Sequence, residues 1–270
     1  MLIWKNTSTL DGYDKRLEFT NSKNKAQCAL IGSKKINLEE FPNLKAIFRA
    51  GIGRDNIPEK EADKKGVIVR FPSKLTENIL FEETASFTCS LIFRMLYNNI
   101  GTLSPWLKNP RAKLSTQNLL IIGRGKIGSR VIDLMDPFIK LTTFDILYNN
   151  NSDLKSLIKT ADCISIHIPN IDNNKSFFDS KKLSWMKDGA SLVNTARGPI
   201  VDEDALYEEL KNKRLKAAFD VFWKEPYEGK LKKLYPDPFF MTPHIASTCS
   251  EFLLGCRNDL DELIKEITNI

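Results

Sequence analysis

Short apolar runs alternate with amphipathic segments along most of the chain. The runs at 119–122, 141–144, 163–168, 192–195, 217–222 and 239–242 contain few polar residues, which is typical of strands buried in a parallel sheet. Between them, apolar residues at helical spacing predict helices from 126 to before Pro137, at about 153–159, and from an N-capping Asp202 through Leu210. The pattern predicts an α/β fold in which strands and helices alternate.

The two ends of the chain add a second set of elements. Strands are expected at 2–4, 29–31, 46–48 and 67–71. One helix carries Phe81, Ala85, Cys89, Ile92 and Leu96 on one face, and we expect it to connect two domains. A final helix from about Ser250 carries Leu253, Cys256, Leu260, Leu263 and Ile267 on one face. With 270 residues the chain is long enough for two domains of modest size.

A glycine cluster follows the strand at 119–122 and opens the helix at 126. Gly123, Gly125 and Gly128 form the pattern Gly-x-Gly-x-x-Gly, with Lys126 and Ile127 inside it. The first glycine permits a tight turn, the second lets the backbone approach a pyrophosphate, and the third lets helix and strand pack closely. A strand, the glycine cluster, a helix, a second strand and an acidic residue follow one another here, and this order predicts a dinucleotide-binding site. A purely structural glycine turn is the alternative.

An acidic residue, Asp145, ends the next strand about 20 residues past the middle of the glycine cluster. Its carboxylate would accept the ribose hydroxyls of an adenosine and repel a 2′-phosphate, which favours NAD over NADP. The asparagine-rich run at 149–152 then leads directly into the short helix, where a full dinucleotide-binding half has another helix and strand. We therefore expect a sheet without its outermost strand and an open adenine side.

Composition narrows the class of protein. The formal net charge of +6 is spread along the chain, which favours small anionic ligands and argues against nucleic-acid binding. No apolar run is long enough to span a bilayer and no signal-peptide pattern is present, so we expect a cytoplasmic protein that binds no membrane. The five cysteines show neither Cys-x-x-Cys pairs nor metal spacing, and no metal site is expected.

Three residues form a candidate catalytic set: Arg197, Glu225 and His244. Each follows a predicted strand, at the sheet edge where α/β proteins bind ligands. Reduction of a 2-oxo acid needs a proton donor, a cation for the carboxylate and a hydride source. An imidazole has an ordinary pKa of about 6.5, near working pH, and a carboxylate can orient it. A guanidinium can bind a carboxylate with two hydrogen bonds. Taken singly, Arg197 or Glu225 could instead belong to a surface ion pair.

The second histidine, His167, also ends a strand, in the segment Ile-Ser-Ile-His-Ile-Pro. We expect it to contact a cofactor, with a structural histidine as the alternative. Earlier in the chain, Arg49-Ala50-Gly51 ends a strand with small residues that let a ligand approach the backbone. Arg49 and the nearby Arg54 are candidate anion contacts, although either could be a solvated surface charge.

These segments together give the sequence a family resemblance. Arg-Ala-Gly-Ile-Gly-Arg-Asp-Asn, Gly-Arg-Gly-Lys-Ile-Gly, His-Ile-Pro, Asn-Thr-Ala-Arg-Gly, Asp-Val-Phe-Trp-Lys-Glu-Pro and Pro-His-Ile-Ala occur in this order over nearly the whole chain. The sequence resembles the D-isomer-specific 2-hydroxyacid dehydrogenases, and within them it is most similar to 3-phosphoglycerate dehydrogenases. The segment at 70–77 departs from the family pattern, which leaves the substrate open.

The resemblance implies a fold and a set of site residues. It implies a Rossmann-type, doubly wound NAD-binding domain at 99–248, inserted into a smaller flavodoxin-like substrate domain at 1–98 and 249–270. The catalytic roles of Arg197, Glu225 and His244 are implied as well, and so is a homodimer formed through the NAD-binding domain. The implied cofactor contacts add Pro169, Thr195, Ala196 and, toward the nicotinamide carboxamide, Asp220. The implied substrate contacts are Arg49, facing a phosphate, with Ala50 and Gly51.

The expected function is the NAD-dependent interconversion of a D-2-hydroxy acid and its 2-oxo acid, with 3-phosphoglycerate as the leading substrate. A glyoxylate or hydroxypyruvate reductase is the alternative within the same chemistry. A non-catalytic protein that senses NAD(H) is the alternative from another class, although a sensor would not need all three candidate catalytic residues.

Overall fold

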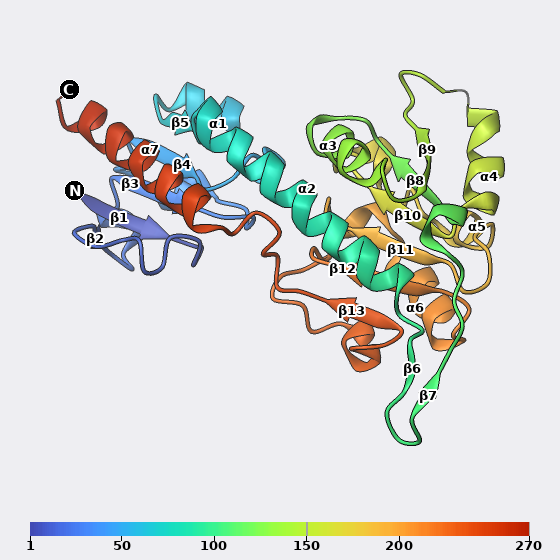
Figure 1. Cartoon of the computed structure of the whole chain (residues 1–270). Coiled ribbons are helices and arrows are strands. Elements are labelled where there is room, and N and C mark those ends of the chain that lie inside the picture. The colour runs from blue at the N-terminus through green and yellow to red at the C-terminus, as the bar shows by residue number, and fades with distance from the viewer. Residues whose placement is uncertain (150, 270) are drawn as a thin grey trace. The chain divides into compact units, whose positions relative to one another are not determined.

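The computed structural model describes residues 1–149 and 151–269 and divides into two compact units, Met1–Leu80 with Ser247–Ile270, and Phe81–Ala246. They are called unit 1 and unit 2 below. The division falls inside the helix α2 (Lys74–Leu96), which contributes its first residues to unit 1 and the remainder to unit 2 (Figure 1). The family resemblance implies a boundary after residue 98, two residues past the end of the same helix.

Unit 1 is built on a five-stranded sheet of order β2-β1-β3-β4-β5, in which every pair of neighbours is parallel. This is the flavodoxin-like order that the resemblance implied. The strands are β1 (Leu2–Lys5), β2 (Glu18–Phe19), β3 (Cys28–Ile31), β4 (Ala46–Arg49) and β5 (Ile68–Arg70). The two-residue β2 was not predicted, because so short a segment carries no periodicity.

Helices cover the sheet of unit 1. They are α1 (Glu59–Lys64), the start of α2 and α7 (Ser250–Thr268), with short 3₁₀ turns at Lys23–Lys25 and Leu38–Glu40. All five apolar residues predicted for the inner face of α7 are buried, together with Phe252. Gly255 lets α7 lie close to Thr76 of α2, because a Cβ there would stand 2.7 Å from the threonine hydroxyl.

Unit 2 is built on a six-stranded parallel sheet of order β13-β12-β11-β10-β8-β9. The strands are β8 (Asn118–Ile122), β9 (Lys140–Phe144), β10 (Cys163–Ile166), β11 (Ser191–Asn194), β12 (Lys216–Phe219) and β13 (Phe239–Met241). Because β9 is the edge strand, the sheet stops where a further helix and strand would have extended it. The strands after β9 end up to three residues earlier than predicted, since the residues beyond them leave the ladder to form the loops described below.

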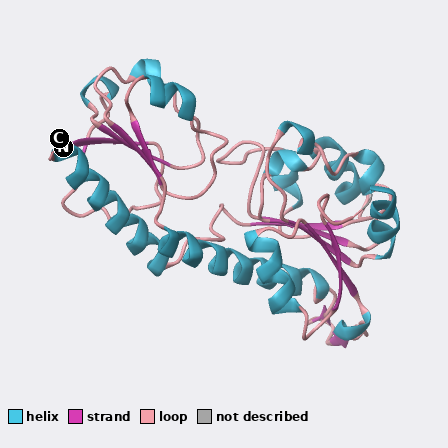
Figure 2. Cartoon of the chain, turned by 90° about the horizontal axis from the view of Figure 1, so that it is seen from above, coloured by secondary structure: helices cyan, strands magenta, loops and turns pink. Residues whose placement is uncertain are grey.

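Both faces of this sheet are covered by helices, as Figure 2 shows, and each face has its own buried apolar cluster. The helices are α3 (Lys126–Met135), α4 (Asn151–Thr160), α5 (Ser180–Leu183), α6 (Glu203–Lys211) and the later part of α2. Short 3₁₀ turns lie at Leu114–Thr116, Asp172–Asn174, Gly198–Ile200 and Lys230–Leu234. The doubly wound α/β fold predicted from the sequence is confirmed.

One face of α3 is buried against the sheet. Val131 and Met135 are fully buried, whereas Leu134 is 45% exposed. Positions 131 and 135 are four residues apart and share a face with 127, so the buried stripe follows the i, i+4, i+8 row. The predicted cap of α6 is confirmed, since the Asp202 carboxylate accepts a hydrogen bond from the Ala205 N–H at 2.8 Å.

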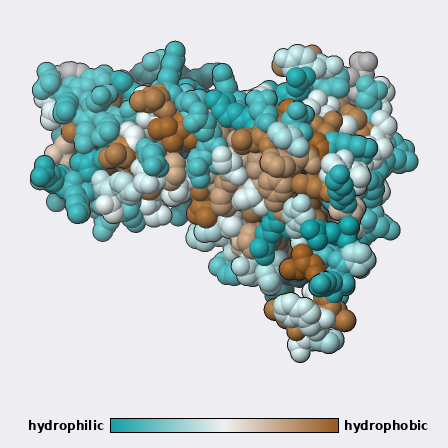
Figure 3. Space-filling view, viewed as in Figure 1, coloured by the Kyte–Doolittle hydropathy of each residue, from teal (hydrophilic) through white to brown (hydrophobic). Residues whose placement is uncertain are grey.

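A two-stranded antiparallel hairpin, β6 (Gly101–Thr102) with β7 (Leu107–Lys108), extends from unit 2 between α2 and β8. It was not predicted from the sequence. Ile100, Leu103, Trp106 and Leu107 are 57–80% exposed, and Figure 3 shows apolar surface on this hairpin. Among the described residues, no helix combines the length and apolar character needed to cross a membrane.

Candidate active site

The glycine cluster follows β8, the strand on whose two sides the chain adds the later strands of the unit 2 sheet. From β8 the chain passes to β9 on one side, whereas β10 to β13 follow on the other side. The loops after β8 and β10 meet there, since a Cβ on Gly123, whose φ is +96°, would lie 2.5 Å from the His167 carbonyl oxygen. This switch point at the carboxyl ends of the strands is where open α/β sheets bind their ligands.

The three glycines of the cluster have different reasons to be glycine. A Cβ on Gly128 would lie 2.0 Å from the Gly123 carbonyl oxygen, so this residue is required for the close packing of α3 on the loop. A Cβ on Gly125 would meet no protein atom within 4 Å, which leaves the backbone open to a ligand. Gly125 is also the N-cap of α3 and has no side chain to satisfy the N–H groups of the first turn, which contains Lys126 and Ile127. This cradle fits a pyrophosphate.

The carboxylate of Asp145 lies beside the glycine loop. Its Oδ2 accepts from the Arg124 N–H at 2.8 Å, and its Oδ1 accepts from the Leu147 N–H at 3.0 Å. A carboxylate offers about four lone-pair sites, so these two bonds leave two for the vicinal hydroxyls of a ribose. The acid predicted from sequence spacing thus lies beside the glycine loop and keeps free acceptor capacity.

His167 follows β10 and is held by its neighbours. The backbone N–H of His167 donates to the Ile122 carbonyl at 2.7 Å, and the ring Nε2 lies 2.8 Å from the Ser165 hydroxyl. Burial lowers the pKa of His167 to about 3, so the ring is neutral near pH 7 and unsuited to acid–base catalysis. Pro169, two residues on, is exposed and its carbonyl accepts from the Asn174 side chain at 2.9 Å.

The loop after β11 carries Thr195, Ala196 and Arg197. Asn194, which is fully buried, braces this loop with both ends of its amide, since Nδ2 donates to the Arg197 carbonyl and Oδ1 accepts from the Ala196 N–H, each at 2.9 Å. The Thr195 hydroxyl lies 2.8 Å from that of Thr88 on α2. Arg197 is half-buried and donates from Nη1 to the Ala196 carbonyl at 2.7 Å.

The loops after β11 and β12 lie against each other. A Cβ on Gly198 would stand 2.2 Å from the backbone of Phe222, so only glycine allows this approach. The strands β11, β12 and β13 are also consecutive neighbours in the sheet. The loops that carry Arg197, Glu225 and His244 therefore leave adjacent strands at the same edge.

Glu225 and His244 are in direct contact. His244 Nδ1 lies 2.8 Å from Glu225 Oε2, and the other carboxylate oxygen accepts from the Phe222 N–H at 3.1 Å. The side chains are 23% and 31% exposed, so the pair is partly shielded and still reachable. His244 has a φ of +57°, a conformation that non-glycine residues rarely adopt and that requires support from the surrounding structure.

Asp220 supplies support for that loop. Its fully buried carboxylate accepts from the Thr242 hydroxyl at 2.6 Å and the Ile245 N–H at 2.8 Å through Oδ1, and from the Ala246 N–H at 2.9 Å through Oδ2. Burial raises the pKa of Asp220, while these three hydrogen bonds act in the opposite direction. The bonds hold both sides of His244, and they leave about one lone pair for any further donor.

In unit 1, Arg49 ends β4 and is followed by Ala50 and Gly51. Arg49 is only 5% exposed, and its Nη1 donates to the Ala50 carbonyl at 2.6 Å. Gly51 has a φ of +140°, and a Cβ there would lie 2.5 Å from Arg49 Nη1. The guanidinium therefore supports the turn, and only glycine fits over it. Arg54 forms an ion pair with Glu59 at 2.9 Å and stacks on Phe71, with 4.0 Å between its Cζ and the ring centroid.

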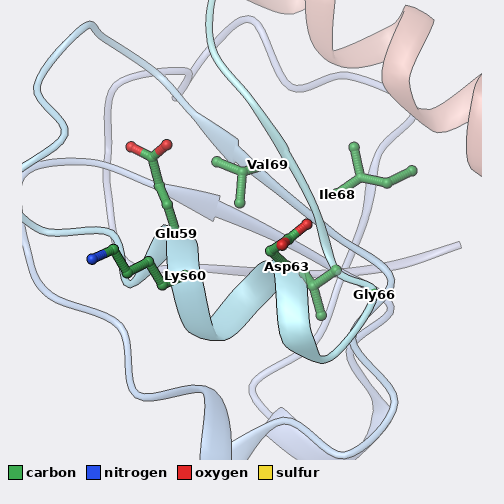
Figure 4. Close-up of a pocket in the computed structure, with 7 residues that line it drawn as sticks. Glu59, Lys60, Asp63, Gly66, Ile68 and Val69 are labelled. Atoms are coloured by element: carbon green, nitrogen blue, oxygen red, sulfur yellow. The ribbon is translucent and has the colours of Figure 1, made fainter.

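A separate pocket in unit 1 lies between α1 and β5 (Figure 4). Its lining includes Glu59, Lys60, Asp63 and Val69, and none of the predicted site residues. Within residues 1–149 and 151–269 no cluster of His, Cys, Asp or Glu is arranged to hold a metal ion. Burial raises the pKa of Cys28, Cys89, Cys163 and Cys256, so these thiols are protonated near neutral pH.

Sequence reasoning did not single out Asn194, Gly198 or Thr242, which position the candidate residues. The first two lie in the quoted segment Asn-Thr-Ala-Arg-Gly, and Thr242 precedes Pro-His. For Asn194 the signal was a polar residue at the end of an apolar strand, next to a reactive residue. Such a side chain needs hydrogen-bond partners, and the nearest groups are the backbone of the site loop.

Known proteins match most of this chain. Residues 102–246 match the model of the D-isomer specific 2-hydroxyacid dehydrogenase, NAD binding domain. A hydroxypyruvate reductase of Thermotoga maritima is 33% identical over 232 residues, which cover 79% of this chain and 74% of the relative. A D-3-phosphoglycerate dehydrogenase of Bacillus subtilis is 31% identical over 83% of this chain, but the match spans only 45% of that protein.

A solved structure shows the same fold. The D-lactate dehydrogenase of Aquifex aeolicus, crystallised with NAD and lactic acid, superposes with a TM-score of 0.80 over 100% of this chain and 96% of its own, at 24% sequence identity. The matching family model is that of an NAD-binding domain, so the cofactor is NAD. The chain belongs to the D-isomer specific 2-hydroxyacid dehydrogenases, which are NAD-dependent oxidoreductases.

Proposed function

We propose that this chain interconverts a D-2-hydroxy acid and its 2-oxo acid, using NAD, with His244, Glu225 and Arg197 as the catalytic residues. The observation that carries the proposal is the 2.8 Å contact between His244 Nδ1 and Glu225 Oε2 at the carboxyl edge of the NAD-binding sheet. A carboxylate at Nδ1 orients the imidazole and leaves Nε2 as the nitrogen that exchanges a proton with the substrate.

The proton transfer follows from this arrangement. During reduction, His244 Nε2–H donates to the carbonyl oxygen of the 2-oxo acid, and during oxidation Nε2 accepts the hydroxyl proton. Glu225 accepts the Nδ1–H bond, which fixes the orientation and the tautomer of the ring. NAD, when bound, supplies or accepts the hydride.

Arg197 is the candidate cation for the substrate carboxylate. It follows β11, one strand away from the strand that leads to Glu225, and Asn194 fixes the backbone on which it stands. A guanidinium can bind a carboxylate with two parallel hydrogen bonds, which orients the substrate as well as attracting it. We assign Pro169, Thr195 and Ala196 to the cofactor, and unit 1 to substrate binding.

The role of Arg49 distinguishes a phosphorylated from an unphosphorylated substrate. If Arg49 contacts a phosphate, the substrate is 3-phosphoglycerate, as the similarity to phosphoglycerate dehydrogenases suggests. Its 5% exposure and its bond to the Ala50 carbonyl are observations that favour the second class, a small unphosphorylated acid such as hydroxypyruvate. The ratio of kcat/KM for phosphohydroxypyruvate and hydroxypyruvate, measured for the wild type and Arg49→Ala, distinguishes them. A phosphate contact requires that the ratio fall in the variant.

We also propose that the chain forms a homodimer through the NAD-binding domain. The support is the β6–β7 hairpin, whose exposed apolar side chains at Leu103, Trp106 and Leu107 would be shielded by a second copy. Sedimentation of the wild type and of Trp106→Ser tests this. A wild-type chain that sediments as a monomer would contradict it.

The catalytic proposal is tested by replacing His244. His244→Ala should lower kcat by about 10² to 10⁴, the usual range for a lost general acid or base. NADH binding, followed by fluorescence, should stay within about threefold of wild type, because the substitution removes no predicted cofactor contact. Arg111→Ala, three residues after β7 and outside the predicted site residues, serves as a control and should retain full turnover. Unchanged turnover in His244→Ala would refute the assignment.

A further inference from the structure

The adenine side of the NAD site needs contacts that the sheet does not supply. In a complete dinucleotide-binding half another strand would lie outside β9, but here β9 is the edge. Asp145 sits at the end of that strand and would hold the ribose. The adenine base is bonded directly to this ribose, so it must lie next to the residues that flank Asp145.

Two of those flanking residues form a stacked pair. The Cζ of Arg124 lies 5.0 Å from the centroid of the Tyr148 ring, so the guanidinium covers one part of the ring. The Arg124 backbone is tied to Asp145 by its N–H, and Tyr148 donates its own N–H to the Asp145 carbonyl at 2.9 Å. Both side chains are therefore anchored through their backbones to the ribose-binding acid.

The segment that follows Asp145 is unusually exposed for its apolar composition. Ile146, Leu147 and Tyr148 are 73%, 79% and 69% exposed, although consecutive apolar residues are normally buried. Exposed apolar surface of this kind marks a binding site when it lies beside a polar anchor. Planar guanidinium and phenol groups are the partners on which nucleobases stack.

We propose that Arg124 and Tyr148 form a one-sided platform on which the adenine of NAD stacks. This inference rests on the proposed NAD-dependent function and adds to it the residues that recognise the base. The platform replaces the contacts that an additional strand and helix would make. The cofactor is then held by the glycine cradle at the pyrophosphate and by the stacked pair at the adenine, with Asp145 on the ribose between them.

The proposal is tested by binding, without turnover. NADH, NADPH and reduced nicotinamide mononucleotide are titrated by fluorescence against the wild type, Tyr148→Ala and Arg124→Ala. The mononucleotide lacks the adenosine. Base stacking on a side chain is worth enough to predict a weakening of NADH binding by about fivefold or more in each variant. Binding of the mononucleotide should be unchanged, because it has no adenine.

Two further variants sharpen the comparison. Tyr148→Phe keeps the ring and should bind NADH like the wild type. Arg111→Ala removes an equivalent pair elsewhere, since the Arg111 Cζ lies 4.9 Å from the Tyr97 ring centroid, and it should also bind NADH normally. A loss of NADH affinity in Tyr148→Ala and Arg124→Ala alone supports the platform.

Three results would overturn the platform. The first is wild-type NADH affinity in both alanine variants, and the second is an equal loss for the mononucleotide, which would show a general disturbance of the site. The third is a loss confined to NADPH in Arg124→Ala, which would make Arg124 a contact to a 2′-phosphate. Failure of the proposed function is recognised separately, because a chain that reduces no 2-oxo acid still yields these titrations.

Discussion

Replacement of Asp220 by asparagine tests how the His244 loop is held. The carboxylate of Asp220 accepts three hydrogen bonds from residues on both sides of His244, at 2.6, 2.8 and 2.9 Å. In Asp220→Asn the amide oxygen can keep the bonds from Thr242 and Ile245. The amide nitrogen then faces the Ala246 N–H, so two donors oppose each other and this bond is lost.

The expected cost can be worked out from that one bond. Losing a buried hydrogen bond to a charged acceptor costs about 1.5–3 kcal/mol. Because burial raises the pKa of Asp220, the charged form is disfavoured at this site and the neutral amide recovers part of the loss. The variant should therefore fold. A displacement of His244 by about 1 Å is enough to lower turnover about 10²-fold, so kcat should fall far more than stability does.

Turnover, NADH affinity and the pH profile of kcat distinguish positioning from cofactor binding. If Asp220 chiefly positions His244, kcat falls and its pH profile shifts, while NADH affinity stays within about threefold of wild type. If Asp220 chiefly binds the nicotinamide carboxamide, as the family resemblance implies, NADH affinity falls instead. Unchanged kcat and an unchanged pH profile would refute the positioning role.

Three further predictions concern Gly125, Gly128 and His167. Gly128→Ala should destabilise the protein by about 1–3 kcal/mol in urea unfolding, because its Cβ would lie 2.0 Å from the Gly123 carbonyl oxygen; unfolding like the wild type would contradict that packing. Gly125→Ala should leave the unfolding midpoint unchanged, since its Cβ meets no protein atom within 4 Å. It should weaken NADH binding about tenfold, because the methyl group occupies the space through which the pyrophosphate approaches the backbone. Unaltered NADH binding would argue against the cradle. Burial lowers the pKa of His167 from 6.5 to about 3, so below pH 6.5 the unfolded chain binds a proton that the folded chain does not. Stability is then lost as the pH falls through this window, by at most about 2 kcal/mol between pH 7 and pH 5, and His167→Gln should show a smaller loss than wild type over the same range; an equal loss would mean that His167 does not contribute.

The sequence pattern predicted much of unit 2 because its signals are local. Continuous apolar runs located the strands, and the spacing of Gly123, Gly125 and Gly128 located the turn at the switch point. The acid at Asp145 followed from its distance along the chain. The edge position of β9 also followed, since the segment from Asp145 to α4 is too short to hold another helix and strand.

Other features depend on contacts that no local pattern records. The Asp220 carboxylate holds the loop of His244 through the Thr242 hydroxyl and two backbone N–H groups, 22 to 26 residues away along the chain. The sequence offers these residue types but does not record their pairing or the positive φ of His244. The β6–β7 hairpin was missed because its strands are two residues long. Arg54 was a candidate anion contact, but its guanidinium forms an ion pair with Glu59 and stacks on Phe71. No local pattern in the sequence indicates these two contacts.

Hydride transfer from NADH to the 2-position of a 2-oxo acid is measured most directly with an isotope label. NADH that carries deuterium at the transferable position is supplied with hydroxypyruvate, and the product is analysed by mass spectrometry and for its configuration. We expect glycerate of D configuration with one deuterium at C2, formed by the wild type and at least about 10²-fold more slowly by His244→Ala. Measurable NADH binding without deuterium transfer to any of a panel of 2-oxo acids, phosphohydroxypyruvate and glyoxylate included, would contradict this expectation.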